Sequence, residues 1–99
     1  MFVTVWEYEV RAGAEAAFEV LYGADGAWVA LFREHPGYLR TELLRGDNGR
    51  YLTLDRWRTA QDYTDFRARL PARYAELDAQ GDALTLAERH LGAFSTADD

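Results

Sequence analysis

One histidine and a group of aromatic side chains are the residues of this chain whose types and positions could support chemistry. His90 lies two positions after Glu88, so in a strand the two side chains would share one face. A neutral imidazole can take a proton near pH 7, so His90 is a candidate general base for an acidic phenol or an activated methylene group. The simpler alternative is a hydrogen-bonded or surface histidine without a catalytic part. The aromatic residues are the candidate walls of a site for such a substrate.

Metal and cofactor chemistry has little support in the sequence. The chain has no cysteine, and His35 and His90 are far apart along it. Glu88 with His90 gives too few ligands for a metal site. The two glycines of residues 23–26 lack the lysine and the length of a phosphate-binding loop. We therefore expect no metal and no cofactor.

Length and charge narrow the class of protein. The 99 residues predict a single domain that buries roughly 60 to 65% of its extended-chain surface. Seventeen acidic residues against eleven basic ones give a net charge of −6, which works against a nucleic-acid partner. The first ten residues contain Glu7 and Glu9 where a signal peptide would be apolar, and no apolar run is long enough to span a membrane. A cytoplasmic protein without a membrane partner is expected.

Hydrophobic periodicity predicts the elements that must position these residues. Residues 1–10 alternate as a strand, and residues 38–45 and 50–57 do the same around a turn whose Asn48-Gly49 pair suits a tight hairpin. An apolar stripe from Phe18 to Phe32 predicts a helix that bends at the two glycines between them.

The second half of the chain predicts another helix and a last strand. Thr59 followed by Asp62 indicates a helix start, Pro71 interrupts the helix, and Gly81 is expected to close it. Residues 84–94 read as a strand and residues 95–99 as a disordered tail, so the domain is expected to span residues 1–94. The resulting βαββαβ order predicts an α+β, ferredoxin-like fold with a four-stranded antiparallel sheet.

Sorting the strand residues by odd and even positions gives the sheet two different faces. One is largely aliphatic: Val3, Val5, Leu39, Thr41, Leu43, Leu52, Leu54, Ala87 and Leu91. The other is aromatic and polar: Trp6, Tyr8, Tyr38, Tyr51, Thr53, Asp55, Trp57, Glu88, His90 and Phe94. Two helices cover only one face, and neither face is simply polar, so we expect a homodimer that buries the uncovered one.

We expect the helices to cover the aromatic and polar face, because rings mixed with hydrogen-bonding groups are typical of a ligand pocket. The residues expected to contact a small aromatic molecule come from this face and from the helix stripes above it: Trp6, Tyr8, Trp28, Phe32, Thr53, Trp57 and Phe66.

Short motifs recur in a characteristic order along almost the whole chain: Trp6-Glu7-Tyr8, Phe18, Tyr22-Gly23, Gly26, Trp28, Leu31-Phe32, Gly37-Tyr38, Thr41-Glu42-Leu43-Leu44, Tyr51-Leu52-Thr53 and Trp57. Their order and spacing resemble the antibiotic biosynthesis monooxygenase (ABM) family. The resemblance implies a dimeric α/β barrel, in which two sheets pack together and each protomer has a cavity between its sheet and helices. It places Trp6, Trp57 and Tyr63 at positions that line this cavity.

Members of that family include oxygenases that oxidise quinol-like or polyketide-derived aromatics without metal or flavin, and relatives that degrade haem. The haem-degrading relatives carry an amide on the first strand and a histidine on the second helix region. This chain has Trp6 at the first place and no histidine between residues 59 and 81, which disfavours haem degradation. Thr53 stands near the position where some oxygenases have asparagine.

The resulting hypothesis is a cofactor-independent monooxygenase acting on a small phenolic, quinol or polyketide-like aromatic molecule. In it His90 or a bound water takes a proton. Trp57 and the hydroxyl group of Tyr63 hold the ring. The alternative is a non-catalytic small-molecule-binding or structural dimer of the same fold, in which these aromatics are only core. Haem binding, with His35 as a candidate ligand, is a third possibility. A cavity of a few hundred cubic ångströms favours the first hypothesis, and a closed, packed interface favours the second.

Overall fold

A computed structural model describes residues 1–98 of the chain, and its strands form one sheet. The strands are β1 (Phe2–Val10), β2 (Tyr38–Arg45), β3 (Arg50–Trp57) and β4 (Thr85–Ser95). They lie in the order β2-β3-β1-β4, with every neighbouring pair antiparallel. This is the predicted α+β, ferredoxin-like architecture. The β2–β3 turn has positive φ at Asn48 and Gly49, 57° and 76°, which explains the Asn-Gly pair there.

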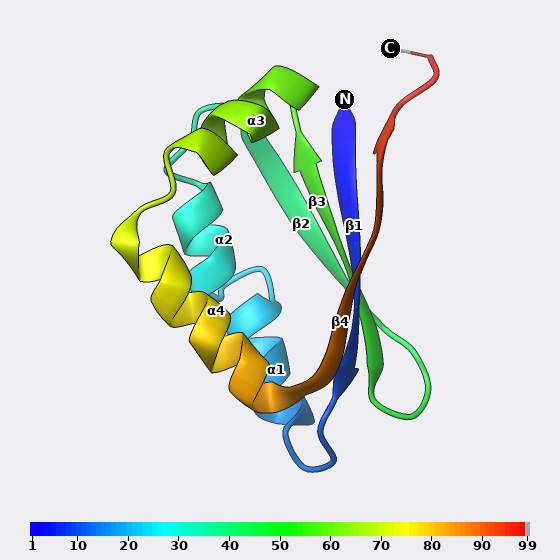
Figure 1. Ribbon diagram of the computed structural model, residues 1–99. Coiled ribbons are helices and arrows are strands. Elements are labelled where there is room, and N and C mark those ends of the chain that lie inside the picture. The colour runs from blue at the N-terminus through cyan, green and yellow to red at the C-terminus, as the bar shows by residue number, and fades with distance from the viewer. Residues whose placement is uncertain (99) are drawn as a thin grey trace.

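Four helices lie on one side of this sheet (Figure 1). They are α1 (Glu15–Tyr22), α2 (Ala27–Phe32), α3 (Ala60–Ala68) and α4 (Ala72–Leu84). The predicted bend at residues 23–26 is a full break between α1 and α2. A side chain at Gly26 would lie 2.4 Å from the Leu21 carbonyl oxygen, so the close approach of these segments requires glycine there.

The beginning of α3 is capped as the sequence predicts. The Thr59 hydroxyl accepts a hydrogen bond from the Asp62 backbone N–H at 3.1 Å. Pro71 is the N-cap residue of α4, so the interruption that its missing N–H imposes falls between the two helices. Together the two helices carry Tyr63, Phe66, Tyr74 and Leu77 over the sheet.

The prediction that Gly81 closes the second helix is wrong, because α4 continues to Leu84. Gly81 is buried inside the helix, where a Cβ atom would lie 2.1 Å from the Tyr22 hydroxyl oxygen. The glycine therefore allows a close contact between α4 and α1.

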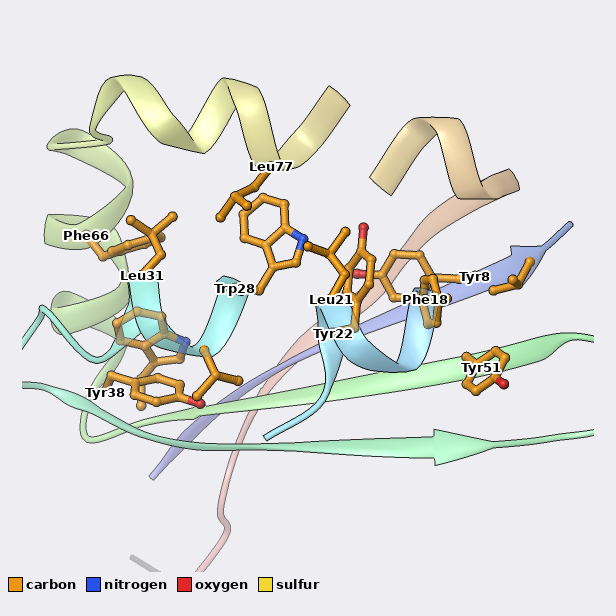
Figure 2. Packing of buried hydrophobic residues seen from close by; sticks show 13 residues of the cluster. Tyr8, Phe18, Leu21, Tyr22, Trp28, Leu31, Tyr38, Tyr51, Phe66 and Leu77 are labelled. Carbon is orange, nitrogen blue, oxygen red and sulfur yellow. The ribbon is translucent and has the colours of Figure 1, made fainter. Parts of the chain in front are cut away.

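The helices cover the aromatic and polar face of the sheet, as predicted. Tyr8, Thr53, Asp55 and Trp57 are all buried beneath them. Figure 2 shows the rings of Phe18, Tyr22 and Trp28 gathered between the helices and the strands. The core is therefore aromatic, with Phe18 and Tyr22 stacked at 4.2 Å between ring centroids.

Register shifts move three residues to the face opposite from the predicted one. The shift between Tyr38 and Arg40 places Thr41 opposite Asp55 and Leu43 opposite Thr53, so both lie on the helix-covered face. In β4 the shift opposite Val5 and Trp6 pairs Phe94 with Val3, on the uncovered face. Simple alternation fails at such bulges because they add one residue to a single strand.

The last strand, β4, ends at Ser95, one residue later than the predicted strand end at residue 94. Ser95 belongs to β4, and Thr96 is held because its backbone N–H and its hydroxyl both donate to the Met1 carbonyl at 3.0 Å. The last residue of the predicted tail, Asp99, lies outside the described residues. None of the helices in residues 1–98 has the length and apolar character needed to cross a membrane.

Candidate functional site

A cavity of about 50 Å³ lies between the helices and the covered face of the sheet. Its walls are mostly aromatic, and the remaining lining groups are three threonines, three carboxylates, one arginine and one valine. The lining residues are Thr4, Trp6, Tyr8, Tyr22, Trp28, Val29, Phe32, Thr41, Thr53, Asp55, Trp57, Tyr63, Phe66, Arg67, Tyr74, Asp78 and Glu88. All four strands contribute, together with all four helices, so the site requires the complete fold.

Every residue predicted to contact a substrate lines this cavity. These residues are Trp6, Tyr8, Trp28, Phe32, Thr53, Trp57 and Phe66, and Tyr63 lies with them. The rings of Trp57 and Tyr63 lie 5.5 Å apart in an edge-on arrangement. The Tyr8 hydroxyl meets the Thr53 hydroxyl at 3.4 Å, and burial raises the pKa of Tyr8 well above its ordinary range.

His90 does not line the cavity. It is an exposed residue on β4 whose ring stacks on Trp6, with 4.6 Å between centroids. Trp6 stands between this imidazole and the buried part of the site. The structure therefore leaves the predicted base outside the space where a substrate ring would lie.

Asp55 is the one buried carboxylate among the described residues that line the cavity. Its side chain belongs to β3 and the residue is only 8% exposed. Thr41 on β2 donates a hydrogen bond to Asp55 Oδ1 at 2.6 Å, and Tyr38 completes the chain with 2.8 Å to the Thr41 hydroxyl. Burial raises the pKa of Asp55 to about 6, although the hydrogen bond from Thr41 acts in the opposite direction.

Sequence reasoning missed Asp55 as a functional candidate, although the signal was present. Asp55 shares the odd positions of β3 with Tyr51, Thr53 and Trp57. A carboxylate on the same side of a strand as three residues expected to be buried requires an explanation, since unpaired buried charges are costly. What the sequence did not show was the absence of a basic partner, because that depends on neighbouring strands.

Two tryptophans that line the cavity, Trp28 and Trp57, have indole donors without an acceptor among the described residues. Trp57 is 1% exposed, and its Nε1–H makes no hydrogen bond among the described residues. A buried donor without a partner costs free energy, which a ligand oxygen would recover. The residues that line the cavity thus include two indoles with unused donors, Trp28 and Trp57, and one buried carboxylate, Asp55, which lies two residues before Trp57 on the same strand.

The outer end of the cavity is charged. The Arg67 guanidinium donates a hydrogen bond to the Tyr74 hydroxyl at 2.7 Å, which links α3 to α4. Asp78, Asp82 and Glu88 have carboxylate oxygens within 4.8 Å of one another, and all three residues are exposed. Burial raises the pKa of Glu88, and repulsion from Asp78 and Asp82 raises it further. These three are the described residues that could share a cation, but exposed carboxylates are often this close without one.

Comparison with known proteins places this cavity in a family. The model of the family named "Antibiotic biosynthesis monooxygenase" matches residues 1–76. A search of curated proteins finds no match.

Among solved structures, SnoaB from Streptomyces nogalater, a cofactor-independent oxygenase, has a TM-score of 0.77 and 25% identity over 96% of this chain and 91% of that one. A mutant of MhuD, solved with two manganese protoporphyrin IX molecules per active site, has a TM-score of 0.74 and 23% identity over 100% and 97% of the two chains. Rv0793 from Mycobacterium tuberculosis has a TM-score of 0.71 and 19% identity over 99% and 96%. The family match covers more than half of the sequence, and the fold agrees with it: this chain belongs to the antibiotic biosynthesis monooxygenase (ABM) family.

Proposed function

We propose that this protein is a cofactor-independent monooxygenase for a small phenolic, quinol or polyketide-like aromatic substrate, bound in the cavity between sheet and helices. The observation that carries the proposal is the composition of that cavity: aromatic walls enclose a buried indole donor that has no partner among the described residues. Such a site favours a flat molecule with an oxygen acceptor. The likeness to SnoaB, a cofactor-independent oxygenase, supports the same reaction class.

The chemistry needs an electron-rich substrate anion, because triplet oxygen does not react readily with a closed-shell neutral phenol. The substrate loses the proton of its hydroxyl group, and oxygen then attacks the ring carbon that carries the negative charge. Overall, one phenol and one O₂ give one quinone and one water. Trp57 and Tyr63 would hold the ring, and the surrounding apolar side chains would exclude water from the anion.

The size of the cavity adds a requirement. About 50 Å³ is less than the roughly 300 to 1,000 Å³ of ordinary ligand sites and less than the few hundred cubic ångströms expected from the sequence. The substrate is therefore small, or the mouth widens when it enters. The Arg67–Tyr74 contact between α3 and α4 is the natural point of opening, since both residues line the outer end.

A non-catalytic, small-molecule-binding protein of the same fold is the second candidate, and the small cavity favours it. Trp57 is almost fully buried and packs against Phe66 at 5.1 Å and Tyr38 at 5.4 Å, as a core residue would.

Haem does not fit the residues of this site. Neither histidine lines the cavity, and His35 Nδ1 already accepts a hydrogen bond from the Gly37 backbone N–H at 3.0 Å. We therefore derive no step through a porphyrin.

We also propose that two copies pack through the uncovered face of the sheet. Val3, Val5, Leu52 and Leu54 lie on that face, and Phe94 joins them through the β4 register shift. Phe94 is exposed on this face, and Val5, Leu52 and Leu54 are only half-buried, which is the reason to expect a partner.

The experiment is an oxygen-consumption assay of the metal-free protein with a panel of naphthols, anthrones and alkylphenols under ¹⁸O₂. The proposal expects one labelled oxygen in the quinone product and a rate above that of the protein-free solution. Trp57→Phe removes the indole donor and should lower the rate at least tenfold while leaving the thermal unfolding temperature within a few degrees. Oxygen consumption that never exceeds the protein-free rate with any member of the panel rejects the oxygenase and leaves the binding protein.

A further inference from the structure

Asp55 is unusual among the carboxylates of this chain because it is buried without a cation. The structure shows ion pairs for Glu7, Glu9, Glu19, Glu34 and Glu42, but none for Asp55 among the described residues. Its neighbours across the sheet are Thr4 on β1 and Thr41 on β2, both neutral hydroxyls. A packed core would ordinarily have an apolar residue at this position, since a buried carboxylate opposes folding.

The hydrogen bonds around Asp55 are all donated toward its carboxylate. Thr41 donates to Oδ1, so the lone pairs on the Thr41 oxygen are left to accept the proton of Tyr38. This Tyr38–Thr41–Asp55 chain points its donors at the carboxylate. It stabilises the ionised form at one oxygen, and the cavity adjoins the same carboxyl group.

We propose that Asp55 is the proton acceptor for a hydroxyl group of the bound ligand, with Thr41 and Tyr38 as positioning residues. The inference deepens the proposed function, on which its catalytic part rests. In the step itself the O–H bond of the phenol breaks, the electron pair stays on the phenol oxygen, and the proton forms a new O–H bond with the Asp55 carboxylate. Asp55 is thus the base in this step, the role for which the sequence suggested His90.

The same geometry defines the ligand more closely than aromatic walls alone. Residues 55 and 57 lie on one face of β3, roughly 7 Å apart along the strand. Asp55 offers an acceptor and the Trp57 indole offers a donor. A ligand that satisfies both carries a hydroxyl donor and, elsewhere on the ring system, an oxygen acceptor, as hydroxyketones and quinols do.

The groups that face Asp55 do not titrate in the same range. Tyr38 of β2, Tyr8 of β1 and Tyr63 of α3 interact with its charge, and burial raises the pKa of each of them above its ordinary value. At the mouth the charged groups are Arg67 of α3, Asp78 of α4 and Glu88 of β4. Burial and nearby carboxylates raise the pKa of Glu88, so a Glu88→Gln variant is needed to separate its titration from that of Asp55.

The test compares 4-methylphenol with 4-methylanisole, in which a methyl group replaces the hydroxyl proton, with dissociation constants from NMR titrations between pH 4.5 and 8.5. Wild-type protein should prefer the phenol by about tenfold or more at pH 8, as expected for a hydrogen bond to a charged acceptor. This preference should fall below about pH 6, where the carboxylate gains a proton.

Asp55→Asn should lose the preference at all pH values. The Thr41 donor engages the amide oxygen, so the amide NH₂ faces the ligand and cannot accept a hydroxyl proton. Thr41→Val should keep the preference but move its midpoint to higher pH, because the Thr41 hydrogen bond lowers the pKa of Asp55. Asp47→Asn in the β2–β3 turn is the matched control, and this variant and His90→Asn should retain the wild-type midpoint. The pH dependence that remains in Glu88→Gln is the part that belongs to Asp55.

The outcomes separate this inference from the proposed function. Equal affinity for the two probes in wild-type protein, no binding of either probe, or an unchanged preference in Asp55→Asn overturns the assignment of Asp55. If the preference is present but no phenol consumes oxygen, Asp55 remains the ligand's acceptor and the oxygenase is rejected. If oxygen consumption persists in Asp55→Asn with an unchanged pH profile, the oxygenase stands and Asp55 is not its base.

Discussion

Single residues of the cavity show a conflict between stability and ligand binding. Asp55 has no cationic partner among the described residues, and Trp57 has an indole donor without an acceptor there, although both are buried. Each feature opposes folding in the empty protein. A bound molecule with a hydroxyl group and an oxygen acceptor would remove both costs, so ligand binding and stability are coupled at these two positions.

The charge of Asp55 should make the protein less stable at neutral than at acidic pH. Burial raises its pKa to about 6 from 3.8, so between these values the folded chain holds more protons than the unfolded chain, and stability falls as pH rises. A shift of this size corresponds to about 3 kcal/mol. Asp55→Asn should therefore match wild type near pH 4 and exceed it by about 2–3 kcal/mol at pH 8, measured by urea unfolding. A stability difference that is constant across this range would contradict the prediction.

Residue types predicted the aromatic residues that line the cavity, but they did not predict that Asp55 is its buried carboxylate. The positions of Trp57, Thr53 and Tyr8 on one strand face, together with the aromatic helix stripes, were sufficient to predict the cavity lining. His90 was chosen as a base because its type titrates near neutral pH. Exposure of His90 and burial of Asp55 depend on how neighbouring strands and helices pack, and a single sequence does not show that.

At the scale of elements, the close contact between α4 and α1 depends on Gly81. Its missing side chain leaves space for the Tyr22 hydroxyl, which would lie 2.1 Å from an added Cβ. Glycine in a helix ordinarily indicates a weak or ending helix, which is why the sequence predicted the end of α4 too early. The contact partner, Tyr22, lies in another helix far away in the chain, so no local pattern could reveal it.

Gly81→Ala should therefore destabilise the protein by about 1–3 kcal/mol, although alanine is the better helix former. Tyr22→Phe removes the hydroxyl that would clash, so the double variant should recover part of the loss in a thermal unfolding experiment. Gln80→Ala, at an exposed position of the same helix, is the control and should change stability by less than about 0.5 kcal/mol. A Gly81→Ala variant at least as stable as wild type would show that α4 and α1 are not in this contact.

The N-cap of α3 links local structure to the site, because this helix carries Tyr63 and Phe66 into the cavity wall. Thr59→Ala removes the hydroxyl that accepts the Asp62 N–H and should cost about 1 kcal/mol. The same loss should weaken binding of 4-methylphenol by loosening the first turn of α3. Thr64→Ala, on the exposed side of α3, provides the comparison, and equal effects of the two substitutions in urea unfolding would exclude a capping role.

At the scale of the whole molecule, the fold was predictable because the order of strands and helices along the chain restricts how the strands can pair. Four strand patterns, one tight turn and two helical stripes leave few ways to form an antiparallel sheet with helices on one side. Strand register was less predictable: the bulges in β2 and β4 moved Thr41, Leu43 and Phe94 to opposite faces. Such shifts depend on the fit between adjacent strands and on glycine, here Gly92 with a φ of 153°.

The uncovered face of the sheet combines satisfied charges with exposed apolar groups. Glu42 pairs with Arg56 at 2.7 Å and Glu7 with Arg89 at 3.5 Å, so these charges are neutralised within the chain. Phe94 lies on the edge strand β4 beside Val3, and its large apolar side chain is 57% exposed. A face of this kind is complementary to a second copy of itself under a two-fold axis.

Phe94→Glu should consequently convert a dimer into a monomer, because two-fold symmetry places the new charge in the interface twice and desolvates it. We expect sedimentation equilibrium at micromolar concentration to give twice the 11.3 kDa chain mass for wild type and about the chain mass for the variant. Val20→Glu is the matched control, since Val20 is 76% exposed on α1, away from the sheet face, and this variant should remain dimeric. A wild-type monomer at that concentration would contradict pairing through the sheet, and dissociation of both variants would show that the added charge acts without regard to the face that carries it.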